Sequence, residues 1–178
     1  MFSKTKNYFL KKYISDNKPQ RNVQLVDLNH AKSIAMLCEI TNEDSYKNIF
    51  QIFTKLQNSG RQVKLIGYVN DTAVPFYCLP QLSADYFCNK NLNWFGMPNL
   101  IQLQDFLKVE YDMLIDFNTK LYQPIQALLA LSKSRFIVGR QDGSRNHYDL
   151  FINDDKTDNN KFLESIHNYT LKLTGNDR

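Results

Sequence analysis

The segment from Tyr111 to Arg140 constrains the fold of this chain more than any other part of the sequence. It contains two short apolar runs, residues 113–115 and 136–138, separated by a stretch that begins near Pro124 and is rich in alanine and leucine. A strand with one solvated face alternates apolar and polar residues, whereas consecutive apolar residues are typical of strands covered on both faces. Proline is well tolerated in the first turn of a helix. The segment therefore predicts a βαβ unit, in which a helix connects two parallel strands.

The same alternation of apolar strands and amphipathic helices continues along the rest of the chain. The sequence predicts further strands at residues 33–40, 63–69, 84–88 and 148–152, and helices near residues 43–59, 100–107 and 162–173. Thr41 or Asn42 is expected to cap the first of these helices, and Gly60 to follow its last turn. This order of elements predicts an α/β fold: a three-layer, Rossmann-like, doubly wound sheet of five to six mostly parallel strands.

Residues 1–21 are predicted to form a basic amphipathic helix, followed by a single Rossmann-like domain at residues 22–178. The helix carries six basic side chains against one acidic one, a balance of +5, while the rest of the chain sums to −1. Three roles fit this N-terminal arm: it binds RNA or the ribosome through phosphates, it lies on an anionic membrane surface, or it packs on the domain. Packing and binding are compatible with each other. The apolar stripe that would pack consists of Phe2, Phe9, Leu10, Tyr13 and Ile14, and the principal cations are Lys4, Lys6, Lys11 and Lys12.

Length and cysteine usage indicate a cytoplasmic protein with one core. A chain of 178 residues is long enough to bury roughly 70% of its unfolded surface without disulfides or a structural metal. Cys38, Cys78 and Cys88 are odd in number and lie in or beside apolar segments, as reduced thiols do. No apolar run approaches the roughly 20 residues of a transmembrane helix. Lysines interrupt what would have to be the apolar core of a signal peptide.

Ligands of open α/β sheets bind at the carboxyl ends of the strands. This rule nominates Glu39, Asn70, Asp116, Asn118 and Arg140 as residues of a ligand crevice. Asp116 is the strongest candidate because it ends an apolar strand. The alternative interpretation is that Asp116 caps a turn or the following helix, since Asp and Asn favour turns regardless of function.

Signatures of common catalytic and cofactor sites are missing from the sequence. The first strand-to-helix turn, residues 39–44, has no glycine and contains three carboxylates. A phosphate would meet repulsion there rather than the backbone cradle of a dinucleotide or P-loop site. The three histidines are scattered, and no Cys/His pair has the spacing of a zinc site. We therefore expect no cofactor and no metal, and the sequence leans away from an enzyme.

The loop from Leu92 to Pro98 holds the only tryptophan of the chain. Trp94 and Phe95 are candidates for stacking on a base or sugar, or for anchoring a partner. The alternative is that they fold back over the edge of the sheet, with Gly96 shaping the turn, because large aromatic side chains are usually buried.

Two resemblances accompany these patterns. The motifs AKSIAMLCEIT (residues 31–41), GYVN (67–70), DYFCNKNLNWFGMPN (85–99), YDMLIDF (111–117) and FIVGR (136–140) resemble an uncharacterised family of small cytoplasmic α/β proteins from Bacteroidetes. Resemblance to that family implies that nearly the whole chain belongs to one unit, but it implies no activity. Separately, residues 111–153, with YDMLID, ALLALSKSRF and IVGR, are similar to the end of the N-terminal domain of heptosyltransferase-type glycosyltransferases. This second resemblance implies a half-fold without the domain that holds the sugar nucleotide.

These observations favour a non-enzymatic, cytoplasmic, partner-binding protein that uses its basic N-terminal helix. RNA, the ribosome, another protein and an anionic surface are the partners that remain open. The alternative is a small-ligand or sugar-nucleotide-related protein with a crevice at the strand ends. A third hypothesis is a subunit of a dimer that assembles through the Trp94 loop or an edge strand.

Overall fold

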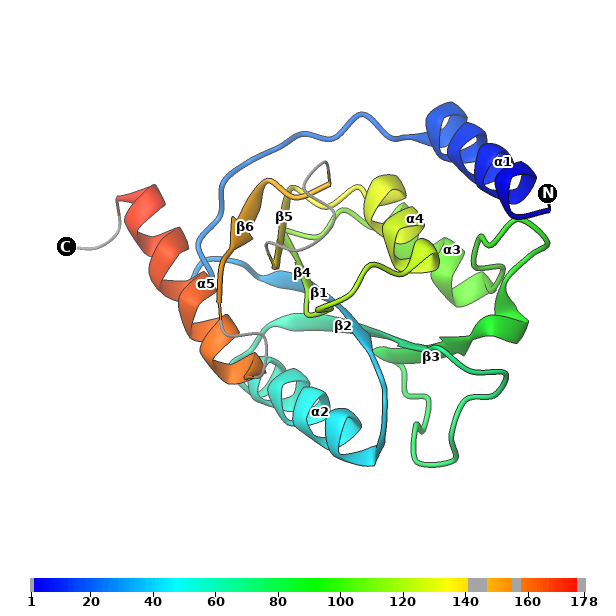
Figure 1. The fold of residues 1–178 in the computed structure, drawn as a ribbon. Coiled ribbons are helices and arrows are strands. Elements are labelled where there is room, and N and C mark those ends of the chain that lie inside the picture. Colours follow the sequence, from blue (N-terminus) through cyan, green and yellow to red (C-terminus); the bar gives the residue numbers. More distant parts are fainter. Residues whose placement is uncertain (1, 141–146, 155–157, 176–178) are drawn as a thin grey trace.

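The structure is a computed structural model that describes residues 2–140, 147–154 and 158–175, with the side chains of residues 2 and 3 outside this description. One six-stranded sheet runs through the molecule, and helices lie on both of its faces (Figure 1). The prediction of a three-layer Rossmann-like α/β fold is thereby confirmed. The strands are β1 (Ser33–Glu39), β2 (Gln62–Val69), β3 (Ala84–Cys88), β4 (Met113–Asp116), β5 (Phe136–Arg140) and β6 (Leu150–Ile152).

All neighbouring strands of the sheet are parallel, in the order β3-β2-β1-β4-β5-β6. The central strands β1 and β4 are almost fully buried, which accounts for their unbroken apolar runs. The chain moves outward from β1 through β2 to β3, then returns to β4 and moves outward through β5 to β6. The direction of winding therefore reverses between β1 and β4.

The helices divide between the two faces of the sheet. Helices α2 and α5 pack on one face, over the cluster that includes Met36, Ile115 and Val138. Helices α3 and α4 pack on the other face, over the cluster that includes Leu37, Ile66 and Leu114. The helices are α1 (Phe2–Asn17), α2 (Glu43–Asn58), α3 (Ile101–Lys108), α4 (Gln123–Leu131) and α5 (Asn159–Thr174), with the 3-10 turn η1 at Asn89–Asn91.

The start of α2 shows how local sequence positions a helix. Asn42 is its N-cap: the Asn42 side chain accepts a hydrogen bond from the backbone N–H of Ser45 (2.8 Å), and the Ser45 hydroxyl lies 3.1 Å from the backbone nitrogen of Asn42. This reciprocal capping box satisfies donors that the first turn leaves free. At the other end, Gly60 adopts a φ of +85°, which ends the helix at little steric cost.

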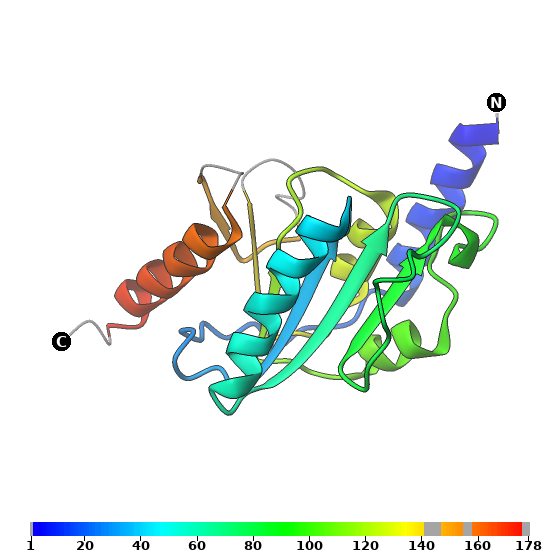
Figure 2. The same ribbon diagram turned by 90° about the horizontal axis from the view of Figure 1, so that it is seen from below.

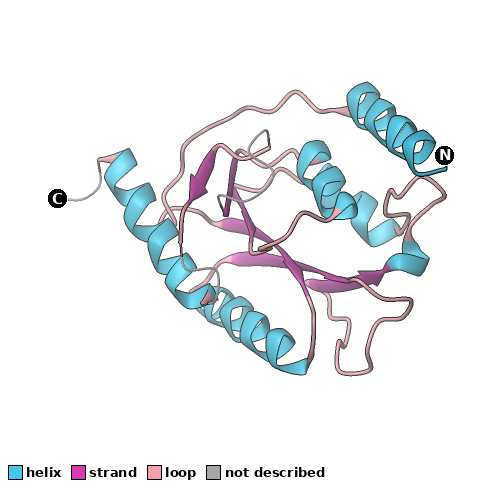
Figure 3. Cartoon of the chain, in the orientation of Figure 1, coloured by secondary structure: helices cyan, strands magenta, loops and turns pink. Residues whose placement is uncertain are grey.

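The connection from β2 to β3 contains no helix. Residues 70–83 form a loop in place of the helical crossover (Figure 3). Cys78 is buried within it, and the ring of Tyr77 lies 5.7 Å from that of Tyr46 on α2. The loop thus covers the α2 face of the outer strands.

Two strand glycines make room for tyrosine rings. A Cβ atom at Gly139 on β5 would lie 2.2 Å from the ring of Tyr148, and one at Gly67 on β2 would lie 2.5 Å from the ring of Tyr86. Real Cβ atoms do not approach other atoms this closely, so each glycine allows a ring to lie directly on the sheet.

Helices α1 and α5 lie at opposite sides of the sheet in both ribbon views (Figures 1 and 2). Helix α1 packs on the outside of α4, so it forms an additional partial layer. Within the described ranges, no helix combines the length and the apolar character that crossing a membrane requires.

Candidate functional site

The reversal of winding between β1 and β4 places the ends of these two strands at the point where α/β proteins bind ligands. Glu39 closes β1 and Asp116 closes β4. Each lies two positions after a residue of the α3/α4-side cluster, Leu37 and Leu114 respectively. Because strand side chains alternate between faces, both carboxylates point to the α3/α4 side. The structure thus places the two acidic residues that the sequence nominated at the same edge and on the same face of the sheet.

Asp116 is a buried carboxylate that its own chain satisfies. Its Oδ1 accepts hydrogen bonds from the backbone N–H (3.0 Å) and the side-chain amide (2.5 Å) of Asn118, and its Oδ2 accepts from the Tyr148 hydroxyl (2.6 Å). Burial raises the pKa of Asp116, and the donors from Tyr148 and Asn118 together with the charge of Arg140 oppose that rise. Asp116 therefore orders the end of β4 and holds the ring of Tyr148 against β5.

The raised pKa of Asp116 gives a pH-dependent prediction. A carboxyl group whose pKa is higher in the folded state binds its proton more tightly there, so its contribution to stability declines as pH rises from the ordinary Asp pKa through the raised one. Asp116→Asn removes this titration. The unfolding free energy of the wild type minus that of Asp116→Asn should therefore fall with rising pH, starting near pH 4. Urea denaturation across a pH series measures this difference, and a rise with pH would contradict the assignment.

Glu39 belongs to a second polar cluster at the same edge. Its carboxylate accepts a hydrogen bond from the Tyr122 hydroxyl, whose pKa is raised by burial and by this bond. The Tyr122 ring lies 5.4 Å from that of Tyr68. The Tyr68 hydroxyl in turn lies 2.6 Å from Asn89 Oδ1 and 3.2 Å from Asn70 Oδ1. Three residues of this cluster, Tyr68, Asn89 and Tyr122, were not nominated from the sequence.

Arg140 lies on the opposite face of the sheet from these clusters. It follows Gly139, the register partner of Asp116, so its side chain points to the α5 side. The residue is 2% exposed, and its guanidinium group lies 4.1 Å from the ring centroid of Phe162. The guanidinium group also donates hydrogen bonds that connect β5 to the residues after β4 and β6 and to the start of α5. Its Nε donates to the Asp154 carboxylate (3.1 and 3.2 Å), and its Nη2 donates to Asp158 O (3.3 Å). Its Nη1 donates to Phe117 O (2.6 Å) and to Asn159 Oδ1 (3.1 Å).

The N-terminal helix α1 is docked on the domain through its apolar stripe. Leu10 is 4% exposed and packs in a cluster with Met97, Ala127 and Leu131. Ile14 is partly buried against the same cluster. Arg21, which follows α1 in the sequence, also fixes the arm to the domain. It donates a hydrogen bond to Ser134 O (2.8 Å) and forms an ion pair with Asp149 (2.5 Å). Docking therefore uses Leu10, Ile14 and Arg21 rather than the lysines.

The lysines of α1 remain on its solvent side. Lys4, Lys6, Lys11 and Lys12 are all exposed, and no ion pair of these lysines is found in the part of the chain that the structure describes. Residues 4, 8, 11 and 12 of a helix share one face, so Lys4, Lys11 and Lys12 flank the exposed ring of Tyr8. The docked arm consequently presents an uncompensated basic face.

The Trp94 loop contributes aromatic rings to the edge of this basic face. Asn93 Oδ1 accepts from the backbone N–H groups of Phe95 (3.2 Å) and Met97 (3.0 Å), and the chain turns at Gly96 with a φ of +92°. The Trp94 ring meets the Phe9 ring edge-on at a centroid distance of 4.9 Å, yet Trp94 keeps 58% of its surface exposed. The loop thus folds back onto α1 and still offers an aromatic surface.

A cleft of about 410 Å³ lies between α1 and α4. None of the described residues that line it is acidic. Burial and the neighbouring Lys18 lower the pKa of His147, so its imidazole is neutral at physiological pH. Amides and cations therefore dominate the polar part of the lining, which consists of Asn7, Leu10, Lys11, Ile14, Ser15, Lys18, Gln123, Gln126 and His147.

A model described as "Family of unknown function (DUF6913)" matches residues 4–173 of the chain. The chain belongs to this family. The DUF6913 match runs from the first turn of α1 to the last turn of α5, so the docked basic helix is part of what defines the match. Among curated proteins and among solved structures, no match to the chain is found.

Proposed function

We propose that this chain is a non-enzymatic cytoplasmic protein that binds single-stranded RNA through the docked helix α1, the Trp94 loop and the cleft between α1 and α4. The observation that carries the proposal is the orientation of α1. Leu10 and Ile14 of its apolar stripe pack against α4, while Lys4, Lys11 and Lys12 face solvent without ion pairs among the described residues. A helix held in this way presents fixed positive charge at a defined place on the surface.

The docked orientation favours RNA over a membrane surface. An interfacial helix binds lipid by inserting its apolar face below the headgroups. In this chain the aliphatic part of that face is occupied, because Leu10 is 4% exposed and packs against Met97, Ala127 and Leu131, whereas the rings of Phe9 and Tyr13 stay 41% and 40% exposed. The groups that remain available are ammonium groups, amides and partly exposed rings.

Those groups match the phosphates and the bases of single-stranded RNA. Lysines bind backbone phosphates, and aromatic rings stack on bases without strong sequence preference. Lys11 and Lys18 line the cleft beside α1, and the rings of Tyr8 and Trp94 are exposed at 62% and 58%. We propose that phosphates follow the lysines and the cleft, and that bases stack on Tyr8 and Trp94.

The proposal predicts salt-dependent binding of a labelled oligouridine, measured by fluorescence anisotropy. Lys4→Gln/Lys11→Gln/Lys12→Gln should weaken binding roughly tenfold and reduce the slope of log K against log salt by about 2, at about 0.7 per lost phosphate contact. Because Trp94 is the only tryptophan, stacking of a base should also quench the intrinsic fluorescence of the wild type.

A matched control removes the same charge elsewhere. Lys32, Lys161 and Lys172 are exposed and lie outside α1. Their triple replacement by glutamine should leave the affinity for oligouridine unchanged. Equal losses in both variants would show only non-specific attraction. Binding to vesicles of anionic phosphatidylserine in place of RNA, or capture of a nuclease-resistant protein partner that depends on α1, would each overturn the RNA proposal.

A second candidate function is binding of a small nucleotide or sugar ligand at the reversal point, as expected for a relative of glycosyltransferases. The position of Glu39 and Asp116 on one face of the sheet at that point favours it. Thermal shift against a panel of nucleotides and sugar nucleotides tests it, since a ligand at about 100 times its Kd stabilises by about 2.7 kcal/mol. If no compound of the panel raises the melting temperature, this candidate function is contradicted.

A further inference from the structure

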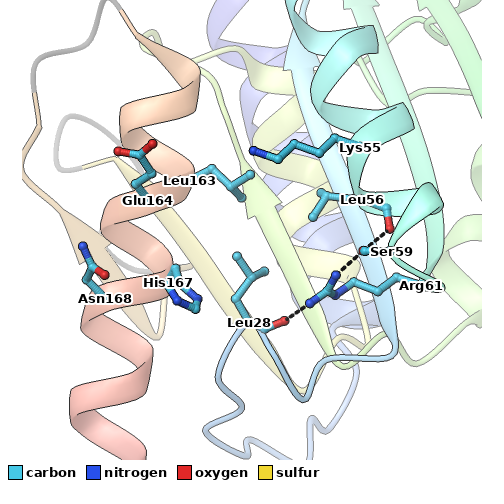
Figure 4. A pocket seen from close by; sticks show the side chains of 9 residues that line it. All are labelled: Leu28, Lys55, Leu56, Ser59, Arg61, Leu163, Glu164, His167 and Asn168. Carbon is cyan, nitrogen blue, oxygen red and sulfur yellow. Dashed lines mark hydrogen bonds between the residues drawn. The ribbon is translucent and has the colours of Figure 1, made fainter. Parts of the chain in front are cut away.

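We propose that the pocket between α2 and α5 binds a small amphipathic monocarboxylate, a molecule with one carboxylate and an apolar body. The pocket has a volume of about 430 Å³, which is in the range of small-molecule sites. It lies between the last turns of α2 and the middle of α5, above the segment that precedes β1 (Figure 4). This proposal is independent of RNA binding, because α2 and α5 cover the other face of the sheet from α1 and α4.

The base of the pocket is apolar. Leu28, Leu56 and Leu163 come from three different segments, and their side chains converge in the space between the helices (Figure 4). They are only 6%, 5% and 7% exposed. Burying an apolar group against such a base is favourable by about 25 cal/mol for each Å² removed from water.

Two cations flank this apolar base from opposite sides. Lys55 extends from α2 toward α5 across the mouth of the pocket, and Arg61 lies at its lower end (Figure 4). Neither side chain has an ion pair with another described residue. A ligand with a negative group would therefore provide the counter-charge that the described part of the chain does not.

Arg61 is held in place but incompletely satisfied. Its Nη2 donates to the carbonyl oxygen of Leu28 at 3.0 Å, and its Nη1 contacts the hydroxyl of Ser59. Its Nε is buried and has no hydrogen-bond partner among the described residues. Guanidinium groups carry five N–H donors in a planar fork that matches a carboxylate. The two fixed contacts orient this fork while leaving donor capacity for a ligand.

The remaining lining residues are consistent with a single negative charge on the ligand. Glu164 and Asn168 point away from the centre of the pocket on the outer side of α5, and His167 faces the space near Leu28 (Figure 4). Apart from His167, the lining carries two cations, Lys55 and Arg61, and one carboxylate, Glu164. A monocarboxylate balances this excess, whereas a polyphosphate would exceed it and leave the leucine base uncovered.

The test uses the full chain and three probes of the same shape: 3-phenylpropionate, 3-phenylpropanol and 3-phenylpropylamine. Chemical-shift perturbation in ¹H–¹⁵N spectra should place the carboxylate probe beside Leu28, Leu56 and Leu163. We expect a dissociation constant on the order of 1 mM for a ligand of about 11 non-hydrogen atoms. The alcohol should bind at least roughly fivefold more weakly, and the amine should not bind.

Two variants test whether Lys55 provides the positive charge that binds the carboxylate of the probe. Lys55→Gln should weaken binding of 3-phenylpropionate roughly fivefold to tenfold. The matched control is Lys47→Gln on the same helix, where Lys47 pairs with Glu43 away from the pocket, and it should have no effect. Equal affinity for the acid and the alcohol, unchanged affinity in a folded Lys55→Gln variant, or absence of shifts at the three leucines would each overturn the proposal.

Discussion

Replacing Arg140 by methionine is expected to lower the free energy of unfolding by about 3–5 kcal/mol, the cost of breaking a buried ion pair from one side. Methionine retains part of the apolar volume but none of the donors. The Asp154 carboxylate, the Phe117 carbonyl oxygen and the Asn159 side chain would each lose a partner inside the protein. Arg140→Lys should also be costly, because an ammonium group cannot reproduce a planar fork with several acceptors.

Urea denaturation of the full chain measures this loss. The control is Arg135→Met, because Arg135 is 39% exposed in its side chain and pairs with Glu110 and Asp112 near solvent. Exposed pairs contribute about 0–1 kcal/mol. A loss below about 1 kcal/mol for Arg140→Met would mean that the contacts between β5 and the start of α5 contribute little to stability.

Gly139→Ala is the second substitution with a large expected effect, a loss of about 3 kcal/mol of unfolding free energy. The added Cβ would come within 2.2 Å of the Tyr148 ring, so the ring must move. Movement of the ring breaks the hydrogen bond from the Tyr148 hydroxyl to Asp116, and the buried carboxylate then loses a donor. The cost therefore combines steric overlap with a lost hydrogen bond.

A double-mutant cycle isolates this mechanism. In a Tyr148→Ala background the ring is absent, so Gly139→Ala should cost less than about 1 kcal/mol. The coupling free energy between the two positions should be close to the full cost of the overlap. Additive effects of the two substitutions would contradict the mechanism and would place the cost of Gly139→Ala in the backbone of β5.

The strands and helices were predictable because each is encoded locally. Consecutive apolar residues at positions 113–115 and 136–138 indicate strands covered on both faces, and Asn42 carries the chemistry of a helix cap in its own side chain. The order of the strands was not predictable, because it depends on how separate βαβ units associate. No local pattern distinguishes an inner strand from the neighbour beside it.

The residues of the candidate crevice were likewise predictable only where they belong to a strand end, and not where folding brings them in from a loop. The rule for strand ends correctly brings Glu39 and Asp116 to one edge, but it does not specify the face, which is why Arg140 was grouped with them. Tyr122 and Tyr148 were missed because both lie in loops that reach the strand ends only in the folded structure. A tyrosine in a loop carries no signal of the carboxylate that it will contact.

The N-terminal arm was expected to dock on the domain, to bind a partner, or to do both, and the structure shows docking. The amphipathic stripe predicts that one face will be buried, but its partner, the surface formed by Met97, Ala127 and Leu131, is more than 80 residues away in the sequence. The exposure of the lysines follows from that docking. Binding of RNA by this face stays a prediction for the oligouridine experiment.

The distance in sequence between the arm and its docking surface has a consequence for biosynthesis. Helix α1 packs on residues between 94 and 131, and Arg21 reaches as far as Asp149. At about 5–20 residues per second, the arm leaves the ribosome on the order of ten seconds before this surface exists. Until then its apolar stripe and its lysines are both exposed beside the RNA-rich exit of the ribosome. Attachment of the first helix is thus a late event in the maturation of the chain.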